Sequence, residues 1–388
     1  MSRQNMRTSF TLRATLVALT AAFGVSACGG NSSVPPPGVP GDPISQEQTP
    51  VAPAVDTTSI LKRLKKVVVI GSTVDPTNGD MGAHAISVAS TTFGSLRKGQ
   101  ILVCNYADSS GNAGKGTTID VFNPMANSKP VTYIHDPRVE GCDADALTSG
   151  NFLDAGSFTN GDLVAYTNKA KYYRTYKAPF QEPSSNADAY NPNLYSAEYV
   201  YTSDAKTGSI VSFSINSFGN PKPTQVVTGF DVNNGSGWNV LGPSGVQYYG
   251  RKKSDIVYVV DGVDNTLVAI DNASNLLAKD EIIVLPGGTK FKCKYKKFTC
   301  ARLIYHGAPL SGPVAMALLP NGNLIIANTV GGNKLVEIAT NGQVLGTRVI
   351  DKSSIPHIFA LHAIGSTDSD TALYLTDTKT NKLYLWKQ

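Results

Sequence analysis

One hairpin pattern recurs along the chain and limits the folds open to it. Its clearest copy is Asp255–Asp271, DIVYVVDGVDNTLVAID, in which an apolar β-branched run ends at Asp261. A turn over residues 262–265 leads into a second strand, 266–271, whose apolar residues face both sides. β-Branched runs separated by turn residues are typical of a β-hairpin. The pattern therefore predicts strands, and the question becomes how many copies the chain holds.

Five further copies align on the Asp or Asn that closes the first strand, at intervals of roughly 35 to 65 residues. The six closing residues are Asn105, Asn168, Asp204, Asp261, Asn328 and Asp377. Short strands precede several copies, and those at 242–246 and 312–316 open with Gly-Pro. A period of this size with several strands in each repeat is typical of a β-propeller, whose radially packed blades leave only short edges exposed.

The two ends of the chain suggest how the ring closes. The sequence stops just after the hairpin strand 382–386, so the last blade lacks an outermost strand, which Val67–Ile70 can supply. Ser59–Lys66 is expected to form one or two helical turns before it. We predict an all-β chain with six four-stranded blades closed by an N-terminal strand. Seven blades remain the alternative, because the Tyr-rich stretch 165–201 has no clear Gly-Pro opening.

The motifs Gly-Pro-Ser-Gly-Val, Gly-Pro-Val-Ala-Met and Val-Tyr-Val-Val-Asp resemble the NHL-repeat propellers of secreted bacterial proteins over about residues 66–388. They are more distantly similar to gluconolactonase and strictosidine-synthase-like propellers. Lactonase-like propellers bind a divalent cation through a glutamate, asparagines and an aspartate on one face. Asn168, Asp261 and Asn328 match such ligands, whereas His84 stands where the glutamate of the first blade is expected.

The first 27 residues read as a signal peptide. Arg3, Arg7 and Arg13 precede an apolar run over 14–25, which is too short to span a bilayer. The run closes on Val25-Ser26-Ala27-Cys28, which resembles the bacterial lipobox and implies lipidation of Cys28. The glycine at position 29, in place of an aspartate, favours the outer membrane, facing the periplasm or the cell surface. An ordinary secretory signal is the alternative.

Residues 28–58 are rich in Pro, Gly, Ser and Gln and have no apolar periodicity, so we predict a tether that leads to a propeller domain over 59–388. Removing residues 1–27 removes three of 34 basic residues and none of 29 acidic ones, so the formal net charge falls from +5 to +2. That charge gives no indication of nucleic-acid binding.

Four cysteines remain besides Cys28. An even number in an exported chain favours disulfides. Cys293 and Cys300 bracket a six-residue stretch that a hairpin can span, and Cys104 and Cys142 fall in neighbouring blades. We predict both bridges; buried free thiols are the alternative for the second pair. Neither spacing is that of a zinc finger.

Polar residues should gather at one mouth of the central channel. The inner strand of a blade starts on the face where the second strand ends, so His84 and His357 should share a face with the six closing residues. Imidazoles among carboxylates and amides could hold a polar ligand or a divalent metal. In the alternative, Asp and Asn only close turns and backbone carbonyls cap the histidines.

A basic stretch, Thr289–Cys300, interleaves five lysines with aromatic residues. Alternation would place Lys292, Lys294 and Lys296 on one side of an extended strand. The range Lys290–Lys297 could contact an anionic glycan or lipid, or another envelope protein; a solvated edge strand protected by lysines is the alternative.

No nucleophile elbow, zinc-protease helix or dinucleotide fingerprint occurs in the chain. We therefore predict a monomeric, lipid-anchored binding or scaffolding module without a catalytic residue or cofactor. The competing hypothesis is a lactonase-type hydrolase that depends on a divalent cation.

Overall fold

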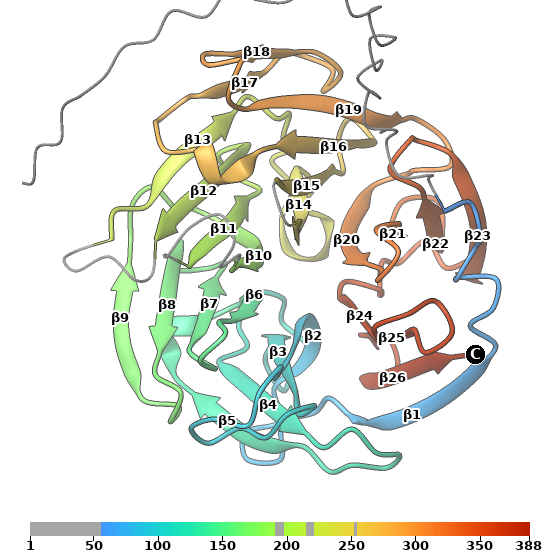
Figure 1. Ribbon diagram of the computed structural model, residues 1–388. Coiled ribbons are helices and arrows are strands. Elements are labelled where there is room, and N and C mark those ends of the chain that lie inside the picture. The colour runs from blue at the N-terminus through green and yellow to red at the C-terminus, as the bar shows by residue number, and fades with distance from the viewer. Residues whose placement is uncertain (1–55, 191–197, 215–220, 252–253) are drawn as a thin grey trace, which may run out of the picture. The chain divides into compact units, whose positions relative to one another are not determined.

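The computed structural model describes residues 56–190, 198–214, 221–251 and 254–388. The predicted signal peptide, Cys28 and nearly all of the predicted tether lie outside these residues. In the ranges described, six sheets surround a central axis, so the predicted six-bladed propeller is confirmed (Figure 1). No helix in the same ranges has the length and apolar character of a membrane span.

Blades 1 to 3 come first along the chain. Blade 1 consists of β2 (Met81–Val88), β3 (Ile101–Ala107), β4 (Thr118–Phe122) and β5 (Val131–His135). Blade 2 consists of β6 (Cys142–Leu147), β7 (Leu153–Ser157), β8 (Asp162–Tyr166) and β9 (Tyr172–Tyr176). Blade 3 consists of β10 (Pro183–Ala189), β11 (Tyr199–Asp204), β12 (Ser209–Ser214) and β13 (Thr224–Thr228).

Blades 4 to 6 complete the ring. Blade 4 consists of β14 (Pro243–Gly250), β15 (Asp255–Asp261), β16 (Thr266–Asp271) and β19 (Cys300–His306). Blade 5 consists of β20 (Pro313–Leu318), β21 (Leu324–Asn328), β22 (Asn333–Ile338) and β23 (Val344–Asp351). Blade 6 consists of β24 (Leu361–Ile364), β25 (Ala372–Asp377), β26 (Lys382–Lys387) and β1 (Lys66–Ser72).

The ring closes as predicted. β1 pairs antiparallel with β26, with Val67 opposite Trp386, so the N-terminal strand is the outermost strand of blade 6. A single turn precedes it, closed by a hydrogen bond of 3.2 Å from the Leu64 N–H to the carbonyl of Ile60, and the side chains of Ile60, Leu61 and Leu64 pack into the core between blades 5 and 6. Three short 3-10 helices are described: η1 (Pro137–Val139), η2 (Gly237–Asn239) and η3 (Ala273–Asn275).

Apolar side chains fill the spaces between blades. The core forms six clusters, and each joins two neighbouring blades, including blades 6 and 1. Alternating residues of one strand thus serve two clusters: Val257 and Val259 pack toward blade 3, whereas Tyr258 and Val260 pack toward blade 5. Burial on both faces explains why the middle strands read as continuous apolar runs.

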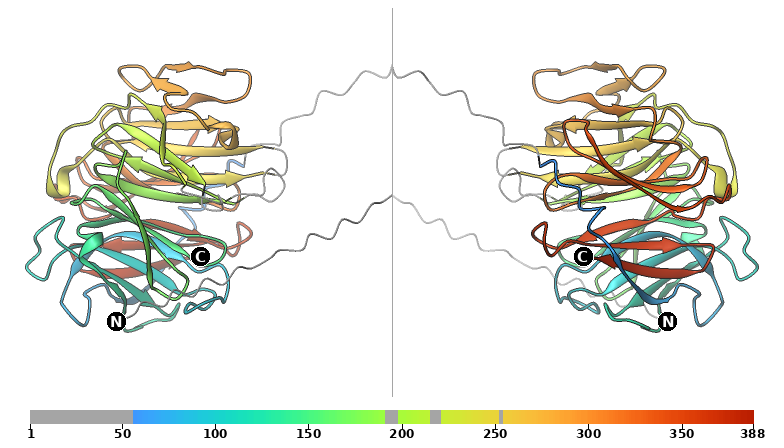
Figure 2. Two further views of the ribbon diagram at one scale, coloured as in Figure 1. Left: turned by 90° about the vertical axis from the view of Figure 1, so that its left-hand side faces the viewer. Right: turned by 90° about the vertical axis from the view of Figure 1, so that its right-hand side faces the viewer.

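Two strands lie outside the four-stranded plan. β17 (Ile282–Val284) and β18 (Phe291–Cys293) interrupt blade 4 between β16 and β19, and β17 pairs in parallel with β13 at the edge of blade 3. Figures 1 and 2 show this pair at the periphery of the ring. The predicted extended strand is present only over Phe291–Cys293. Lys294–Phe298 is a turn, so Lys292, Lys294 and Lys296 do not lie on one side of a strand.

Both predicted disulfides are confirmed. Cys104 of β3 is bridged to Cys142 of β6, which links blades 1 and 2, with 5.4 Å between the Cα atoms. Cys293 of β18 is bridged to Cys300 of β19, also with 5.4 Å between the Cα atoms. The second bridge ties the inserted pair of strands to blade 4.

The placement of Asn168 corrects the alignment of blade 2. Asn168 follows β8, the third strand, whereas the second strand β7 ends at Ser157 opposite Cys142. Third strands run antiparallel to second strands, so Asn168 lies at the opposite end of the blade from the other closing residues. A hairpin of strands three and four has the same local sequence pattern as one of strands two and three. The pattern alone therefore placed Asn168 at the end of a second strand.

Candidate functional site

A bulge near its start interrupts the inner strand of five blades. At each bulge one residue of the inner strand has no partner in the second strand, and these residues are His84, Asp143, Ser184, Ser244 and Val314. All five line one cavity together with Phe359, which precedes β24 in the sixth blade. Bulges re-aim side chains, and here each blade contributes one residue to the mouth of the central channel.

His84 is held from three sides in this cavity. Its Nδ1 lies 2.5 Å from Oδ1 of Asp143. Its ring is stacked between Tyr106, at 4.1 Å between centroids, and Phe359, at 4.0 Å. Trp238 packs against it at 5.2 Å. Only 8% of His84 is exposed, so its position and ring plane are fixed before any ligand arrives.

Trp238 lies over this mouth on the connection from blade 3 to blade 4. It belongs to η2, whose Gly237 carbonyl accepts a hydrogen bond of 3.0 Å from the Tyr106 hydroxyl. The indole also approaches Gly82 so closely that a Cβ there would lie 2.7 Å from a ring carbon. Any residue other than glycine at position 82 would therefore displace the indole.

The free nitrogen of His84 defines the chemistry of the mouth. Its Nε2 is buried and has no hydrogen-bond partner among the described residues. Burial raises the pKa of Asp143, and the neighbouring imidazole opposes that rise. With Asp143 ionised, the proton lies on Nδ1 and Nε2 is an acceptor; with Asp143 protonated, Asp143 donates to Nδ1 and Nε2–H is a donor.

The room beside His84 is small. The cavity at the mouth has a volume of about 30 Å³, and a second one of about 50 Å³ follows it down the channel, past Asp145, Asn186 and Gln247. A cavity needs about 10–15 Å³ of such volume to hold one water molecule, so a group of the size of a hydroxyl or a carbonyl oxygen fits there.

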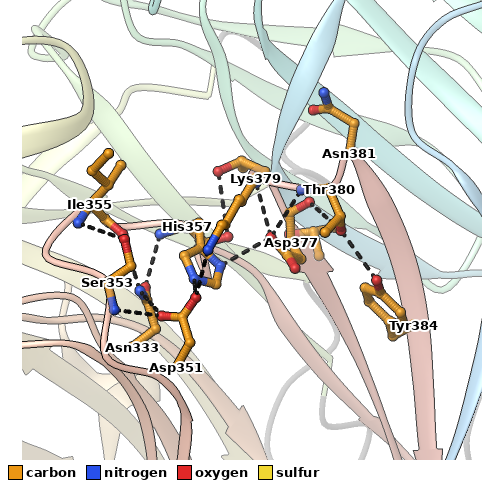
Figure 3. A network of polar contacts seen from close by, with 12 residues as sticks. Asn333, Asp351, Ser353, Ile355, His357, Asp377, Lys379, Thr380, Asn381 and Tyr384 are labelled. Atoms are coloured by element: carbon orange, nitrogen blue, oxygen red, sulfur yellow. Dashed lines mark hydrogen bonds and ion pairs between the residues drawn. The ribbon is translucent and has the colours of Figure 1, made fainter.

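His357 has different neighbours from His84. Its Nε2 lies 2.9 Å from Oδ2 of Asp351 and its Nδ1 lies 3.0 Å from Oδ1 of Asp377, and its backbone N–H donates to Asn333 (Figure 3). Burial opposes protonation, but the two carboxylates outweigh it and raise the pKa of His357. The histidine therefore links blades 5 and 6, with one carboxylate against each of its ring nitrogens.

The other candidate side chains bond within their own surroundings. Asn105 donates to Oδ2 of Asp120 at 3.0 Å, and Asn328 donates to the carbonyl of Pro309 at 2.7 Å. Asp261 accepts from the backbone N–H two residues further on at 2.9 Å, and burial raises its pKa to about 7. The turn-closing interpretation describes Asp261, whereas Asn105 and Asn328 bond to groups outside their own turns.

The ligand set expected for a lactonase is divided between the two ends of the blades. Asn168 lies at the opposite end from Asp261 and Asn328, as described above. Among the residues that the structure describes, no group of three or more His, Cys, Asp or Glu side chains is arranged to hold a metal ion.

Sequence reasoning missed most of the partners of His84. Asp143 directly follows Cys142 at the start of an inner strand, so the same bulge position could have revealed it. Phe359 lies two residues after His357, which the sequence pattern placed on the same face as His84. Trp238 lies in a glycine-rich connection without a repeat, and no pattern places it over the channel.

Comparisons with known proteins bear on the fold of the chain and not on the chemistry of the site. No family model matches the chain, and no curated protein matches it significantly. A gluconolactonase from Xanthomonas campestris is similar in structure, with a TM-score of 0.51 and 8% identity over 86% of this chain and 93% of that one. Virginiamycin B lyase from Staphylococcus aureus has a TM-score of 0.45 and 14% identity over 83% of this chain and 88% of that one. At such identities the likeness shows the propeller fold alone.

Proposed function

We propose that this chain is a lipid-anchored binding module of the bacterial envelope whose ligand places one hydroxyl or carbonyl group against His84. A single observation carries the proposal: Nε2 of His84 is buried, oriented by Asp143 and without a partner. Leaving a buried polar atom unpaired costs about 1–3 kcal/mol. A ligand that pairs with it gains that energy back without any cost of ordering the ring.

The envelope location rests on the N-terminal sequence. The basic residues, the apolar run and the lipobox-like end at Cys28 support lipidation, and the tether of 28–58 supports spacing from an outer membrane. In this proposal the protein is a monomer that faces the periplasm or the cell surface.

The lysine-rich turn supplies a second contact in this proposal. Lys294–Phe298 projects from the inserted strands with Phe298 64% exposed and Tyr295 44% exposed. Exposed lysines beside exposed aromatic rings suit the surface of an anionic lipid or glycan. Such a contact would hold the propeller close to the membrane that carries its anchor.

A fluorescence titration tests the mouth site. The chain has two tryptophans, so Trp386→Phe leaves Trp238 as the reporter that touches His84. Compounds bearing a hydroxyl or carbonyl group, starting with glucono-1,5-lactone and simple sugars, should change its emission. His84→Phe fills the same space without a nitrogen and should abolish the change. Responses that persist equally in His84→Phe would sink the proposal.

The second candidate function is hydrolysis with His84 as a general base. The observation that favours it is the pair Asp143–His84, since a carboxylate on Nδ1 orients the imidazole and fixes which nitrogen carries the proton. Turnover of a lactone that Asp143→Asn and His84→Phe both lose would support this candidate over binding. Elemental analysis separates its metal-dependent form, which requires about one divalent cation per chain after dialysis.

A further inference from the structure

A larger cavity of about 360 Å³ lies at the other end of the channel from His84. It is lined by the later residues of the inner strands, among them Ser87 of β2, Asp145 of β6, Asp188 of β10, Gln247 and Tyr248 of β14, and His362 of β24. The volume falls in the usual range for small-molecule sites, which is roughly 300–1,000 Å³.

Two carboxyl groups in this cavity have oxygens without a partner. Asp145 is 6% exposed; its Oδ2 accepts from the Ser87 hydroxyl at 3.2 Å, while its Oδ1 is buried with no partner among the described residues. Oδ1 of Asp188 is likewise buried and unpaired. A buried carboxylate is costly unless a cation or several donors face it.

Among the residues that the structure describes, neither Lys nor Arg lines this cavity. Burial lowers the pKa of His362 to about 4, so this imidazole is neutral at physiological pH. The remaining titratable groups of the described wall are Tyr190 and Tyr248. Glu198 is hydrogen-bonded to Asp188, and the charges of Glu198 and Asp154 both act against ionisation of Asp188. Acidic side chains therefore outnumber basic ones in the described wall of this cavity.

We infer that this acidic cavity is a second binding site, independent of the His84 site, that accepts an organic ammonium ion through Asp145 and Asp188. An ammonium group supplies the hydrogen-bond donors that the free oxygens lack. The tyrosine rings in the wall offer faces on which its methylene chain or its charge can rest. A bare divalent ion fits less well, because it needs more carboxylate or imidazole ligands together than the described residues bring to one point.

Binding should be coupled to proton release. Burial raises the pKa of Asp145 to about 7, and burial together with the charge of Glu198 raises that of Asp188 to about 9. A bound cation favours the ionised carboxylates, so each ammonium that enters displaces protons. For one group with a pKa near 7, competition by protons weakens binding about tenfold at pH 6 relative to pH 8.

Calorimetry with 1,4-diaminobutane tests the inference on the full mature chain. We expect saturable binding that is at least tenfold tighter at pH 8 than at pH 6, because Asp145 alone gives about tenfold and ionisation of Asp188 adds to it, with protons released to the buffer. Repeating the titration in two buffers of different ionisation enthalpy measures those protons on the unmodified protein. 1,4-Butanediol has the same length without charge and should not bind.

Variants locate the site. Asp145→Asn keeps the shape and should weaken diamine binding at least tenfold, whereas Asp108→Asn, in a turn of blade 1, should leave it unchanged. Equal binding by Asp145→Asn, binding of the diol, or absence of proton release would each overturn the inference. So would stoichiometric displacement of the diamine by Mg²⁺, which would indicate a metal site. His84→Phe should not change diamine binding, so failure of the His84 site leaves this result standing.

Discussion

Glu337 should hold the closing segment of the ring in place. This residue of β22 is fully buried, and its carboxylate accepts three hydrogen bonds from the turn before β1. The donors are the hydroxyl of Ser59 at 2.7 Å and the backbone N–H groups of Ile60 at 3.1 Å and Leu61 at 2.8 Å. These bonds fix the turn that places the side chains of Ile60, Leu61 and Leu64 between blades 5 and 6.

Glu337→Ala should reduce the free energy of unfolding by about 3–5 kcal/mol. Two buried N–H groups lose their acceptor at about 1–3 kcal/mol each, and the cavity left by the carboxylate adds to that cost. Urea denaturation measures the change, with an unchanged slope as the check on two-state behaviour.

Two variants make the test specific. Glu337→Gln keeps one acceptor oxygen and should cost less than Glu337→Ala. Glu140→Ala removes a carboxylate whose partner is the exposed Lys115, at 2.8 Å, and should change stability by less than about 1 kcal/mol. If Glu337→Ala is no worse than Glu140→Ala, the turn does not hold the ring closed and the reasoning is wrong.

Three further predictions concern the bridges, His357 and the anchor. Loss of the Cys104–Cys142 bridge should destabilise more than loss of the Cys293–Cys300 bridge, by about 4 against 2.5 kcal/mol from loop length, measured by urea denaturation of Cys-to-Ser pairs. The raised pKa of His357 means that its ion pairs stabilise the fold at low pH and that this contribution is lost as pH rises through the folded value. His357→Gln should therefore flatten the dependence of stability on pH above about 6.5. Cys28→Ala should abolish labelling by palmitate and release the protein from membranes; equal labelling would refute the anchor.

Much of the fold could be predicted because it depends on local patterns. The hairpin around Asp261, the count of six blades and the pairing of Val67–Ile70 with the last strand all follow from apolar runs and the turn residues between them. Both disulfides follow from where those runs place the cysteines. Each of these inferences depends only on contacts between residues close in sequence or between neighbouring blades.

The errors have a common physical origin. A single hairpin does not reveal its position within a blade, so Asn168 was assigned to a second strand when it follows a third. Strand β17 was missed because it pairs with blade 3, although the chain around it builds blade 4. Alternation predicted a strand through Lys294–Phe298, but the bridge between Cys293 and Cys300 brings both cysteines together and requires a turn.

The bulges explain why the chemistry of the channel is hard to see in the sequence. A bulged residue has no partner in the second strand, so it falls out of the alternation by which strands are recognised. In blades 3, 4 and 5 it directly follows the proline that opens the inner strand. In blades 1 and 2 the corresponding residues are His84 and Asp143, and the contact between them crosses the boundary of two blades. The residues at the channel mouth thus share a position within the blade and have no sequence motif in common. Because that position has no partner in the second strand, its residue can change without any loss of strand pairing.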